Sequence, residues 1–528
     1  RTVIKYCRNY GAVYSDTNVR NVSRPYDASY IGGITGCAYN ETETPDNLII
    51  YNCISSPQYK DITTAGFAAG TGIKGKLYGC YVGGIVGYNY YGAVVGCSTE
   101  AEEDKPGFVF GYKYVGGIIG LNHGVAGGAG ENGTDADIKI NLPHDEEDAD
   151  EFIVRSGVNE ANVAGYSYVG GIAGSNSETK SGSTTIENGL RVPISAVDLN
   201  NKLSRWTNSG IVMASDGYTG GIAGFNTGWI FGCGLHMDES EQIKENDVLT
   251  DIHHVGGIAG YNNGIIGNTD RTVNTSGSNS SRKTGTGAAH GVIAVTAYVT
   301  GGSYVGGITG FNDTDAIIED YALDGGYVYA TGDFAGGYVG LNLSTEFITT
   351  GNDGTVSGTW KVTDGDITGR YFVGAIMGGN ILSADTDIST TINYGNMSGN
   401  VVADAFAGGI AGYTLITDGT YGNSLGIREN MSETEKTETV QWKVESAVDA
   451  DDLAATVRKL DTVSYPGAAE FTISGVSGTT VTASEGLKLK GGVYLGGVLG
   501  YVTANTEIHI ANVTNRASVE AEAAVVNN

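Results

Sequence analysis

A seven-residue phrase recurs along the chain and limits what the chain can fold into. It consists of an aromatic residue, an apolar residue, two glycines, isoleucine, a small apolar residue and glycine, as in Tyr81–Gly87. Close copies begin at Tyr114, Tyr168, Tyr218, His254, Tyr304 and Phe334, and looser copies begin at Tyr30, Phe372, Phe406 and Tyr494. Because self-similarity at such intervals is typical of repeat architectures, the sequence predicts a stack of structural repeats.

The compact repeats predict three short strands each. The phrase is followed by a second apolar segment, such as residues 89–97, and by a third, such as residues 107–111, with Gly, Asn and Asp between them. This pattern favours an all-β fold, a parallel β-helix or β-solenoid of stacked three-strand coils with loop insertions. The longer intervals must hold insertions or an additional degenerate coil. We expect roughly 15 to 20 coils, which at about 4.8 Å each form a rod of about 70–100 Å.

Stacking in register should align equivalent side chains into ladders. If the phrase is one strand, its alternate residues face opposite sides. We expect the isoleucines to form a core ladder of Ile85, Ile118, Ile172, Ile222, Ile258 and Ile308. The asparagines that follow should stack at a corner and bond each other's amides, namely Asn89, Asn122, Asn176, Asn226, Asn262, Asn312 and Asn342. The aromatic column is expected to be packing, with a carbohydrate-stacking platform as the alternative.

The charge and the apolar content of the chain argue against two classes of partner, nucleic acids and the membrane interior. The chain has 59 acidic and 30 basic residues, a formal charge of −29 and a pI near 4.5. Such a surface repels phosphate groups, so nucleic acid is not an expected partner. No apolar run approaches about 18 residues, so no membrane insertion is expected within this chain.

The repeat pattern divides the chain into three parts. Residues 1–414 carry the solenoid repeats, and residues 493–528 resume them, in a repeat that we expect to continue in a longer parent chain. Between them, residues 415–492 lack the phrase and predict a small inserted, irregular α/β element. Within it, residues 445–460 carry an approximate helical stripe of apolar residues.

Four of the six cysteines share one local pattern. Cys7, Cys53, Cys97 and Cys233 each stand three residues after isoleucine or valine, and no cysteine pair is spaced as CxxC. Zinc ribbons and thioredoxin-type sites are therefore not indicated. Equivalent positions should stack from coil to coil, and we expect free thiols packed in a turn, with disulfides as the alternative.

The only chemical site that the sequence indicates is a set of candidate cation ligands. No HExxH motif occurs, and the GxSxG match at residues 422–426 lacks a surrounding βαβ pattern. Alternating aspartates in loop-like contexts offer the hard oxygen ligands that calcium prefers. We therefore name Asp313, Asp315, Asp364 and Asp366 as candidate structural calcium ligands. No catalytic residue and no cofactor other than such calcium is predicted.

The phrases resemble a known motif of bacterial surface proteins. Tyr-Val-Gly-Gly-Ile-x-Gly-x-Asn, followed by Gly-x-Ile-x-x-Cys or Asn, is similar to the GLUG motif. That motif occurs in large secreted adhesins and in the non-catalytic part of some IgA-cleaving metallopeptidases. The resemblance spans nearly the whole chain apart from about 415–492. It implies export, surface display and a β-solenoid, and it carries no catalytic residue onto any position.

Together these features predict a structural or adhesive segment of a large bacterial cell-surface or fibre-forming protein. We expect it to be extracellular and non-enzymatic, with its anchor outside this segment and with binding loops on a rigid solenoid. The expected partner is a glycan or protein of a host or neighbouring cell, with self-association into fibres as a further option. The alternatives are a carbohydrate-active β-helix enzyme, with acids converging from separate coils, and a non-catalytic exosite module of a surface metallopeptidase.

Overall fold

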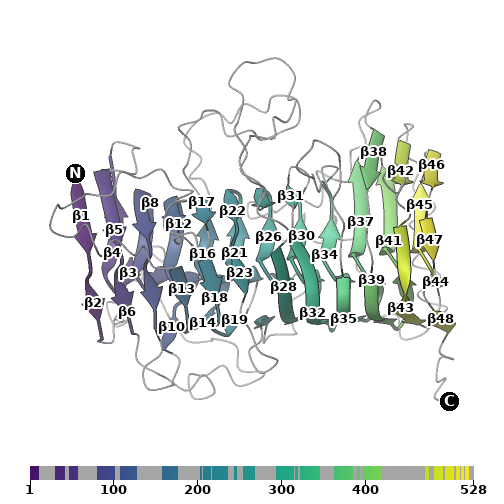
Figure 1. Cartoon of the computed structure of the whole chain (residues 1–528), viewed down its shortest axis with the longest axis horizontal. Coiled ribbons are helices and arrows are strands. Elements are labelled where there is room, and N and C mark those ends of the chain that lie inside the picture. The colour runs from purple at the N-terminus through teal and green to yellow at the C-terminus, as the bar shows by residue number, and fades with distance from the viewer. Residues whose placement is uncertain are drawn as a thin grey trace, which may run out of the picture.

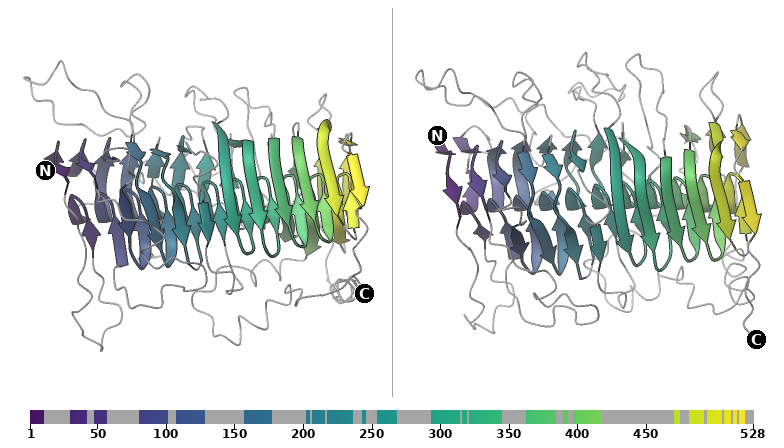
Figure 2. Two further views of the ribbon diagram at one scale, coloured as in Figure 1. Left: turned by 90° about the horizontal axis from the view of Figure 1, so that it is seen from below. Right: turned by 60° about the horizontal axis from the view of Figure 1, so that its bottom comes forward.

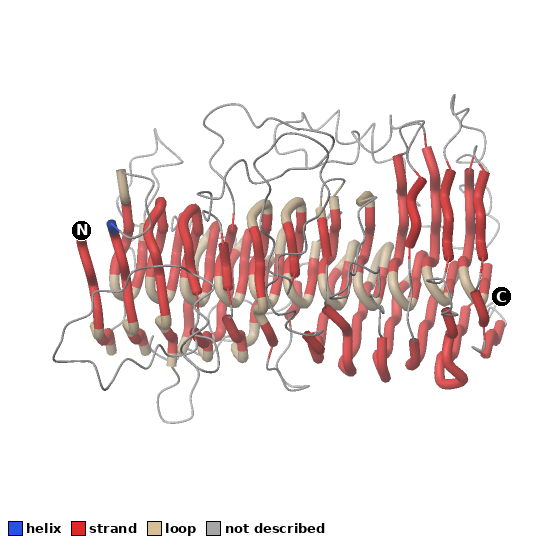
Figure 3. The backbone as a smooth tube through the Cα atoms, turned by 45° about the horizontal axis from the view of Figure 1, so that its top comes forward, coloured by secondary structure: helices blue, strands red, loops and turns tan. Residues whose placement is uncertain are grey.

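The computed structural model of the chain is all-β in the part that it describes, and strands account for most of that backbone (Figure 3). The described residues are 1–10, 30–41, 47–56, 80–100, 107–127, 157–176, 202–204, 206–215, 217–235, 243–245, 254–267, 293–313, 316–318, 321–344, 362–383, 389–392, 397–417, 470–474, 481–491, 494–504, 507–511, 513–515 and 518–521.

The strands form coils that stack along one long axis, from the N-terminal end to the C-terminal end (Figure 1). Strands pair in parallel with the equivalent strands of the neighbouring coils. The predicted parallel β-solenoid is therefore confirmed. Within the described residues, no helix reaches the length and hydropathy of a membrane span.

The eleven copies of the phrase lie in one eleven-stranded sheet, here called the motif sheet. Its strands, in spatial order, are β3 (Ile31–Gly32), β7 (Cys80–Gly83), β11 (Lys113–Gly116), β15 (Ser167–Gly170), β20 (Thr219–Gly220), β25 (Val255–Gly256), β29 (Val305–Gly306), β33 (Ala335–Gly336), β36 (Phe372–Gly374), β40 (Phe406–Gly408) and β44 (Tyr494–Gly496). Each copy pairs directly with the next, even across the long intervals. Within the described residues, no further strand of this sheet lies between consecutive copies, so the expectation of 15 to 20 coils is wrong, and the eleven coils that carry the phrase span about 50 Å.

A seventeen-stranded sheet, here called the wide sheet, follows the motif sheet around each coil. It contains β1 (Thr2–Lys5), β4 (Thr35–Tyr39), β5 (Leu48–Tyr51), β8 (Val86–Val95), β12 (Ile119–Gly127), β16 (Ala173–Asn176), β17 (Lys202–Ser204), β21 (Ala223–Asn226), β22 (Trp229–Phe231), β26 (Ala259–Asn262), β27 (Ile265–Gly267), β30 (Thr309–Asn312), β31 (Ile317–Ile318), β34 (Val339–Asn342), β37 (Met377–Ser383), β41 (Ala411–Thr417) and β45 (Leu499–Ala504).

Three further sheets complete the coils. The short sheet contains β2 (Arg8–Asn9), β6 (Ile54–Ser55), β9 (Ser98–Thr99), β13 (Gly157–Asn159), β18 (Trp206–Asn208) and β23 (Gly234–Leu235). The return sheet contains β10 (Phe108–Phe110), β14 (Asn162–Gly165), β19 (Val212–Ala214), β24 (Ile243–Glu245), β28 (Ile293–Gly301), β32 (Tyr321–Ala330), β35 (Val362–Gly369), β39 (Met397–Ala403), β43 (Val481–Gly491), β47 (Val513–Asn515) and β48 (Ser518–Ala521). A three-stranded sheet contains β38 (Ser389–Ile392), β42 (Glu470–Ser474) and β46 (Glu507–Ala511).

The cross-section of the coil changes midway along the axis. The short sheet ends at β23, and the return strands lengthen from three residues in β24 to nine in β28. The buried Tyr321 marks the change, because its hydroxyl donates to the Cys233 carbonyl at 2.7 Å. The predicted three-strand coil therefore does not hold along the whole axis, because the short sheet adds a side to the earlier coils and the three-stranded sheet adds one to the last coils.

The phrase is a strand, a bend and a second strand, not the single strand that its alternation suggests. In the copy at Tyr81, β7 ends at Gly83 and β8 begins at Val86. A Cβ on Gly83 would lie within 3.0 Å of the Val86 carbonyl oxygen, so the bend requires glycine there. Because of the bend, both Val82 and Ile85 reach the core.

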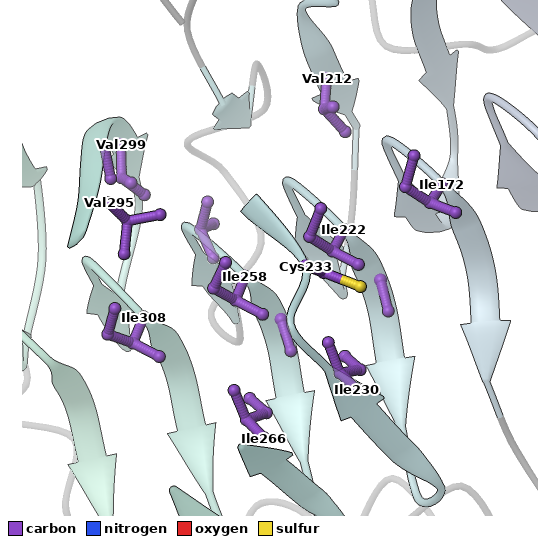
Figure 4. Close-up of a cluster of buried hydrophobic side chains, with 14 of the residues drawn as sticks. Ile172, Val212, Ile222, Ile230, Cys233, Ile258, Ile266, Val295, Val299 and Ile308 are labelled. Carbon is purple, nitrogen blue, oxygen red and sulfur yellow. The ribbon is translucent and has the colours of Figure 1, made fainter. Parts of the chain in front are cut away.

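The motif isoleucines form the predicted core ladder, of which Figure 4 shows Ile172, Ile222, Ile258 and Ile308. Each of them is fully buried, and the backbone N–H of one donates to the carbonyl of the next. The N···O distances along the ladder from Ile85 to Ile308 are 2.8 to 3.0 Å. The core of the solenoid is therefore continuous from coil to coil.

The predicted inserted element is described only in part. The helical stripe at 445–460 lies outside the described residues. Two strands that fall within 415–492 are described, and both pair with solenoid strands: β42 with β38 and β46, and β43 with β39.

Candidate functional site

A ladder of buried asparagine amides runs along the corner where the wide sheet turns. In each step one Nδ2 donates to the Oδ1 of the asparagine in the next coil, at 2.8 to 3.0 Å. The ladder contains Asn89, Asn122, Asn176, Asn226, Asn262, Asn312, Asn342 and Asn380, so the predicted amide bonds are confirmed and Asn380 extends them by one coil. Since neighbours bond only in register, the ladder fixes the alignment of eight coils.

The ladder ends where the side chain at its position changes. Ala38 pairs with Asn89 in the preceding coil, and Thr414 pairs with Asn380 in the following one. The buried Oδ1 of Asn89 and the buried Oγ1 of Thr414 have no hydrogen-bond partner among the described residues. Each end of the ladder therefore carries one unsatisfied polar atom.

The motif aromatics form a second continuous column, separate from the core cluster of the motif isoleucines. From Tyr30 to Tyr494, neighbouring rings lie with centroids 4.6 to 5.4 Å apart. His254 is one of these rings, between Tyr218 and Tyr304. Because neighbouring rings occupy the ring faces, the column packs the coils together and leaves no interior ring face open for a sugar.

Several rings of this column are held by a left-handed backbone. The positive φ values are 65° at Tyr81, 53° at Tyr114, 57° at Tyr168, 55° at Tyr304 and 61° at Phe334. Bulky residues rarely adopt this conformation, and it costs of order 1–3 kcal/mol each. The strain turns each ring out of the strand and onto the column, where stacking offsets it.

The recurring cysteines lie at a corner between the wide sheet and the short sheet. Cys53, Cys97 and Cys233 are fully buried free thiols, and Cys7 is an exposed free thiol. Each donates to the carbonyl two residues before it, at 3.4 to 3.5 Å. Cys7, Cys53 and Cys97 stack from coil to coil as predicted, whereas Gly157 and Trp206 stand between Cys97 and Cys233. The thiols serve as small donors that satisfy corner carbonyls.

The candidate calcium ligands lie apart from one another. Asp313 is buried at a corner after β30, where its Oδ2 accepts from the Tyr261 hydroxyl at 2.5 Å and from the Asn263 amide at 3.4 Å. Asp315 lies outside the described residues, and of Asp364 only the backbone, in β35, is described. Asp366 is exposed on the return sheet. The described residues contain no group of three His, Cys, Asp or Glu side chains placed to hold a metal ion, and calcium binding stays a prediction.

The return sheet carries a set of outward side chains that the sequence reasoning missed. In β32, Val328 is fully buried, whereas its neighbour Tyr329 is 43% exposed. The register places such residues in two rows, here called the outer rows. The first row is Tyr298, Tyr327, Asp366, Asn400 and Lys488, and the second is Thr300, Tyr329, Thr368, Val402 and Lys490. Figure 2 shows the long strands that carry them side by side in the C-terminal half.

The outer rows combine aromatic rings with hydrogen-bonding groups. The rings of Tyr298 and Tyr327 meet edge to face, with centroids 5.4 Å apart. The Asn400 Nδ2 donates to the Asp366 Oδ1 at 2.5 Å. Beyond them, Lys488 is exposed and Lys490 is half-buried. From strand to strand, the rows therefore offer apolar ring surface, then a paired carboxylate and amide, and then two cationic groups on β43.

A local signal for the outer rows exists in the sequence. Tyr327-Val328-Tyr329 alternates aromatic and aliphatic residues, which predicts a strand with tyrosines on one face. The signal is weak because the sequence of the return strand differs from coil to coil, so no recurring motif marks it. Comparison of the chain with protein-family models, with curated proteins and with solved structures finds no match.

The carboxyl group of Asp333 makes the stability of the fold depend on pH. Burial raises the pKa of Asp333 to about 7, although nearby Arg370 acts to lower it. Its Oδ1 is shielded from solvent and accepts no hydrogen bond from the described residues. The folded chain therefore favours the protonated carboxyl group. The stability that protonation of Asp333 gives to the folded chain is full below about pH 4 and is lost as the pH rises through 7.

The variant Asp333→Asn isolates this effect, because it keeps the shape without the charge. We expect its urea unfolding midpoint to exceed that of the wild type at pH 8 and to match it at pH 4. Urea unfolding of both proteins at the two pH values measures the difference. A difference between them that is the same at both pH values would contradict the assignment.

Proposed function

We propose that the chain is a rigid structural and adhesive segment of a large extracellular bacterial protein of the GLUG-motif kind. The observation that carries this proposal is the unbroken asparagine ladder from Asn89 to Asn380, together with the aromatic column beside it. Such ladders hold each coil on its neighbours, and a solenoid built this way resists bending and register shifts. A stiff spacer of this kind suits the display of a binding surface away from a cell.

We further propose that the outer rows bind a neutral polysaccharide. Tyrosine rings offer apolar surface with a polar tip, which complements the apolar faces and hydroxyl groups of sugar rings. The half-buried Tyr327 and the exposed Tyr329 lie on one strand, and Asp366 and Asn400 follow on the next two strands. A net charge of −29 disfavours polyanionic glycans. The inserted loops, which the sequence also favours as binding elements, lie outside the described residues.

Binding of soluble glucans, mannans and xylans to the immobilised chain tests this proposal. The double variant Tyr327→Ala/Tyr329→Ala is expected to weaken binding about tenfold or more, which corresponds to about 1.4 kcal/mol. The matched control is Tyr39→Ala, because Tyr39 is 59% exposed and lies on the wide sheet, outside the outer rows. Binding that is absent, or that is lost equally in the control, would overturn the glycan proposal.

The same experiment separates the adhesive function from the enzymatic alternative. Polysaccharide incubated with the chain is assayed for new reducing ends and for unsaturated sugar products. The proposed function predicts that neither accumulates. Their appearance would instead support a carbohydrate-active β-helix enzyme, for which Asp366 is the first residue to replace. The exosite alternative predicts a metallopeptidase domain elsewhere in the parent gene product.

A further inference from the structure

Three cysteines occupy one register position in consecutive coils. The strand pairings on both sides place Cys7 opposite Cys53, and Cys53 opposite Cys97. The Ile54 N–H donates to the Cys7 carbonyl at 2.9 Å, and the Cys53 N–H donates to the Cys97 Sγ at 3.4 Å. The three thiols therefore form a short column along the solenoid axis.

The spacing of the column suits a covalent bond between neighbouring thiols. Paired strands lie about 4.8 Å apart, and the Cα atoms of a disulfide are usually about 4.4 to 6.8 Å apart. The members of the column differ in access to solvent, since Cys7 is exposed whereas Cys53 and Cys97 are fully buried. A reagent in solution can reach the column only through Cys7.

We propose that Cys7 and Cys53 form a site of reversible disulfide modification, which joins the coil of β1 and β2 to the coil of β5 and β6. The oxidant is a low-molecular-weight disulfide of the glutathione class. The cross-link would hold these two neighbouring coils together covalently. This inference does not depend on the adhesive function.

The reaction proceeds by two thiol–disulfide exchanges. The Cys7 thiolate attacks one sulfur of the small disulfide, forms a Cys7–glutathione mixed disulfide and releases one glutathione thiolate. The Cys53 thiolate then attacks the Cys7 sulfur of that mixed disulfide, forms the Cys7–Cys53 bond and releases the second glutathione thiolate. Overall, two protein thiols lose two protons and two electrons. The electrons reduce the reagent to two glutathione thiolates, which take up two protons from solvent and become two thiols.

The electrostatics of the column favour the second step. The hydrogen bond from the Cys97 thiol lowers the pKa of Cys53 to about 7, against the opposing effect of burial. Burial raises the pKa of Cys97 well above its ordinary value. Burial also raises the pKa of Cys7, so Cys53 has the largest thiolate fraction of the three at neutral pH.

Incubation of the folded chain with glutathione disulfide at neutral pH, followed by alkylation and peptide mass spectrometry, tests the proposal. We expect a Cys7–Cys53 linked peptide pair that has lost two hydrogens and carries no glutathione. Cys37 provides the internal control, because it is exposed but faces Tyr88 across its strand pair. It should stop at the glutathione mixed disulfide.

Two variants make the outcome decisive. In Cys53→Ser, Cys7 should accumulate the mixed disulfide, as Cys37 does in the wild type. In Cys97→Ser, the Cys7–Cys53 link should still form, more slowly at neutral pH. The proposal is overturned if wild-type Cys7 keeps its glutathione, or if Cys53 is found linked to Cys97 instead.

Discussion

Replacing Asn226 with alanine is expected to lower the free energy of unfolding of the surrounding coils by about 2–5 kcal/mol. Asn226 is fully buried in the middle of the ladder, accepts from Asn176 at 2.8 Å and donates to Asn262 at 2.8 Å. Its removal leaves a donor and an acceptor without their ladder partner, and each buried group left unsatisfied costs about 1–3 kcal/mol. Urea unfolding measures the loss, and hydrogen exchange should locate it in the coils next to Asn226.

The ends of the ladder supply the converse test. Ala38→Asn places an amide opposite the unpaired Oδ1 of Asn89 and is expected to stabilise the N-terminal coils by about 1 kcal/mol. If Asn226→Ala proves neutral while Ala38→Asn is destabilising, the amide bonds do not hold the coils in register. The two variants have opposite expected signs, so a general sensitivity of the corner to mutation cannot mimic the result.

Replacing Gly171 with alanine is expected to disrupt the stack severely, although the substitution adds only one methyl group. A Cβ at Gly171 would lie within 3.0 Å of the Gly221 carbonyl oxygen of the next coil and of the Asn208 side chain. Backbone cannot yield without separating the coils, so we expect a loss of about 3 kcal/mol or more, at the upper end of overpacking costs. Thermal and urea unfolding measure it.

Gly234 offers a matched control on the short sheet. A Cβ at Gly234 would have no atom within 4 Å, so Gly234→Ala should leave stability within about 0.5 kcal/mol of the wild type or raise it slightly. Equal effects of the two substitutions would show that glycine flexibility, and not close approach between coils, explains the double glycine.

The ladders could be predicted because they are properties of the repeat. Once Ile85 and Asn89 recur at one place in each coil, parallel stacking brings their equivalents together, whatever the coil's detailed shape. The bend inside the phrase could not be predicted in the same way. Alternation predicts one strand through Tyr81 and Gly87, whereas the carbonyl of Val86 folds back toward Gly83, and only the three-dimensional path reveals that contact.

Features outside the repeat were predicted less well. The short sheet ends at β23, and the bond from the Tyr321 hydroxyl to the Cys233 carbonyl at this point joins residues 88 positions apart. Asp313 has the chemistry of a cation ligand, but its partners Tyr261 and Asn263 come from the preceding coil. The tyrosines of the outer rows lie where successive coils differ in sequence, so no recurring position in the sequence predicts them.

The amide ladder also controls how the gene for this chain can change in length. Consecutive ladder residues are separated by 30 to 54 positions, yet their N···O distances stay between 2.8 and 3.0 Å. An insertion or deletion outside the strands is therefore expected to change the length of one coil and to leave the ladder bonds unaltered. Duplication of one whole coil adds one amide donor and one acceptor and keeps every bond. A duplication of half a coil breaks the ladder, so the rod is expected to grow only in whole steps.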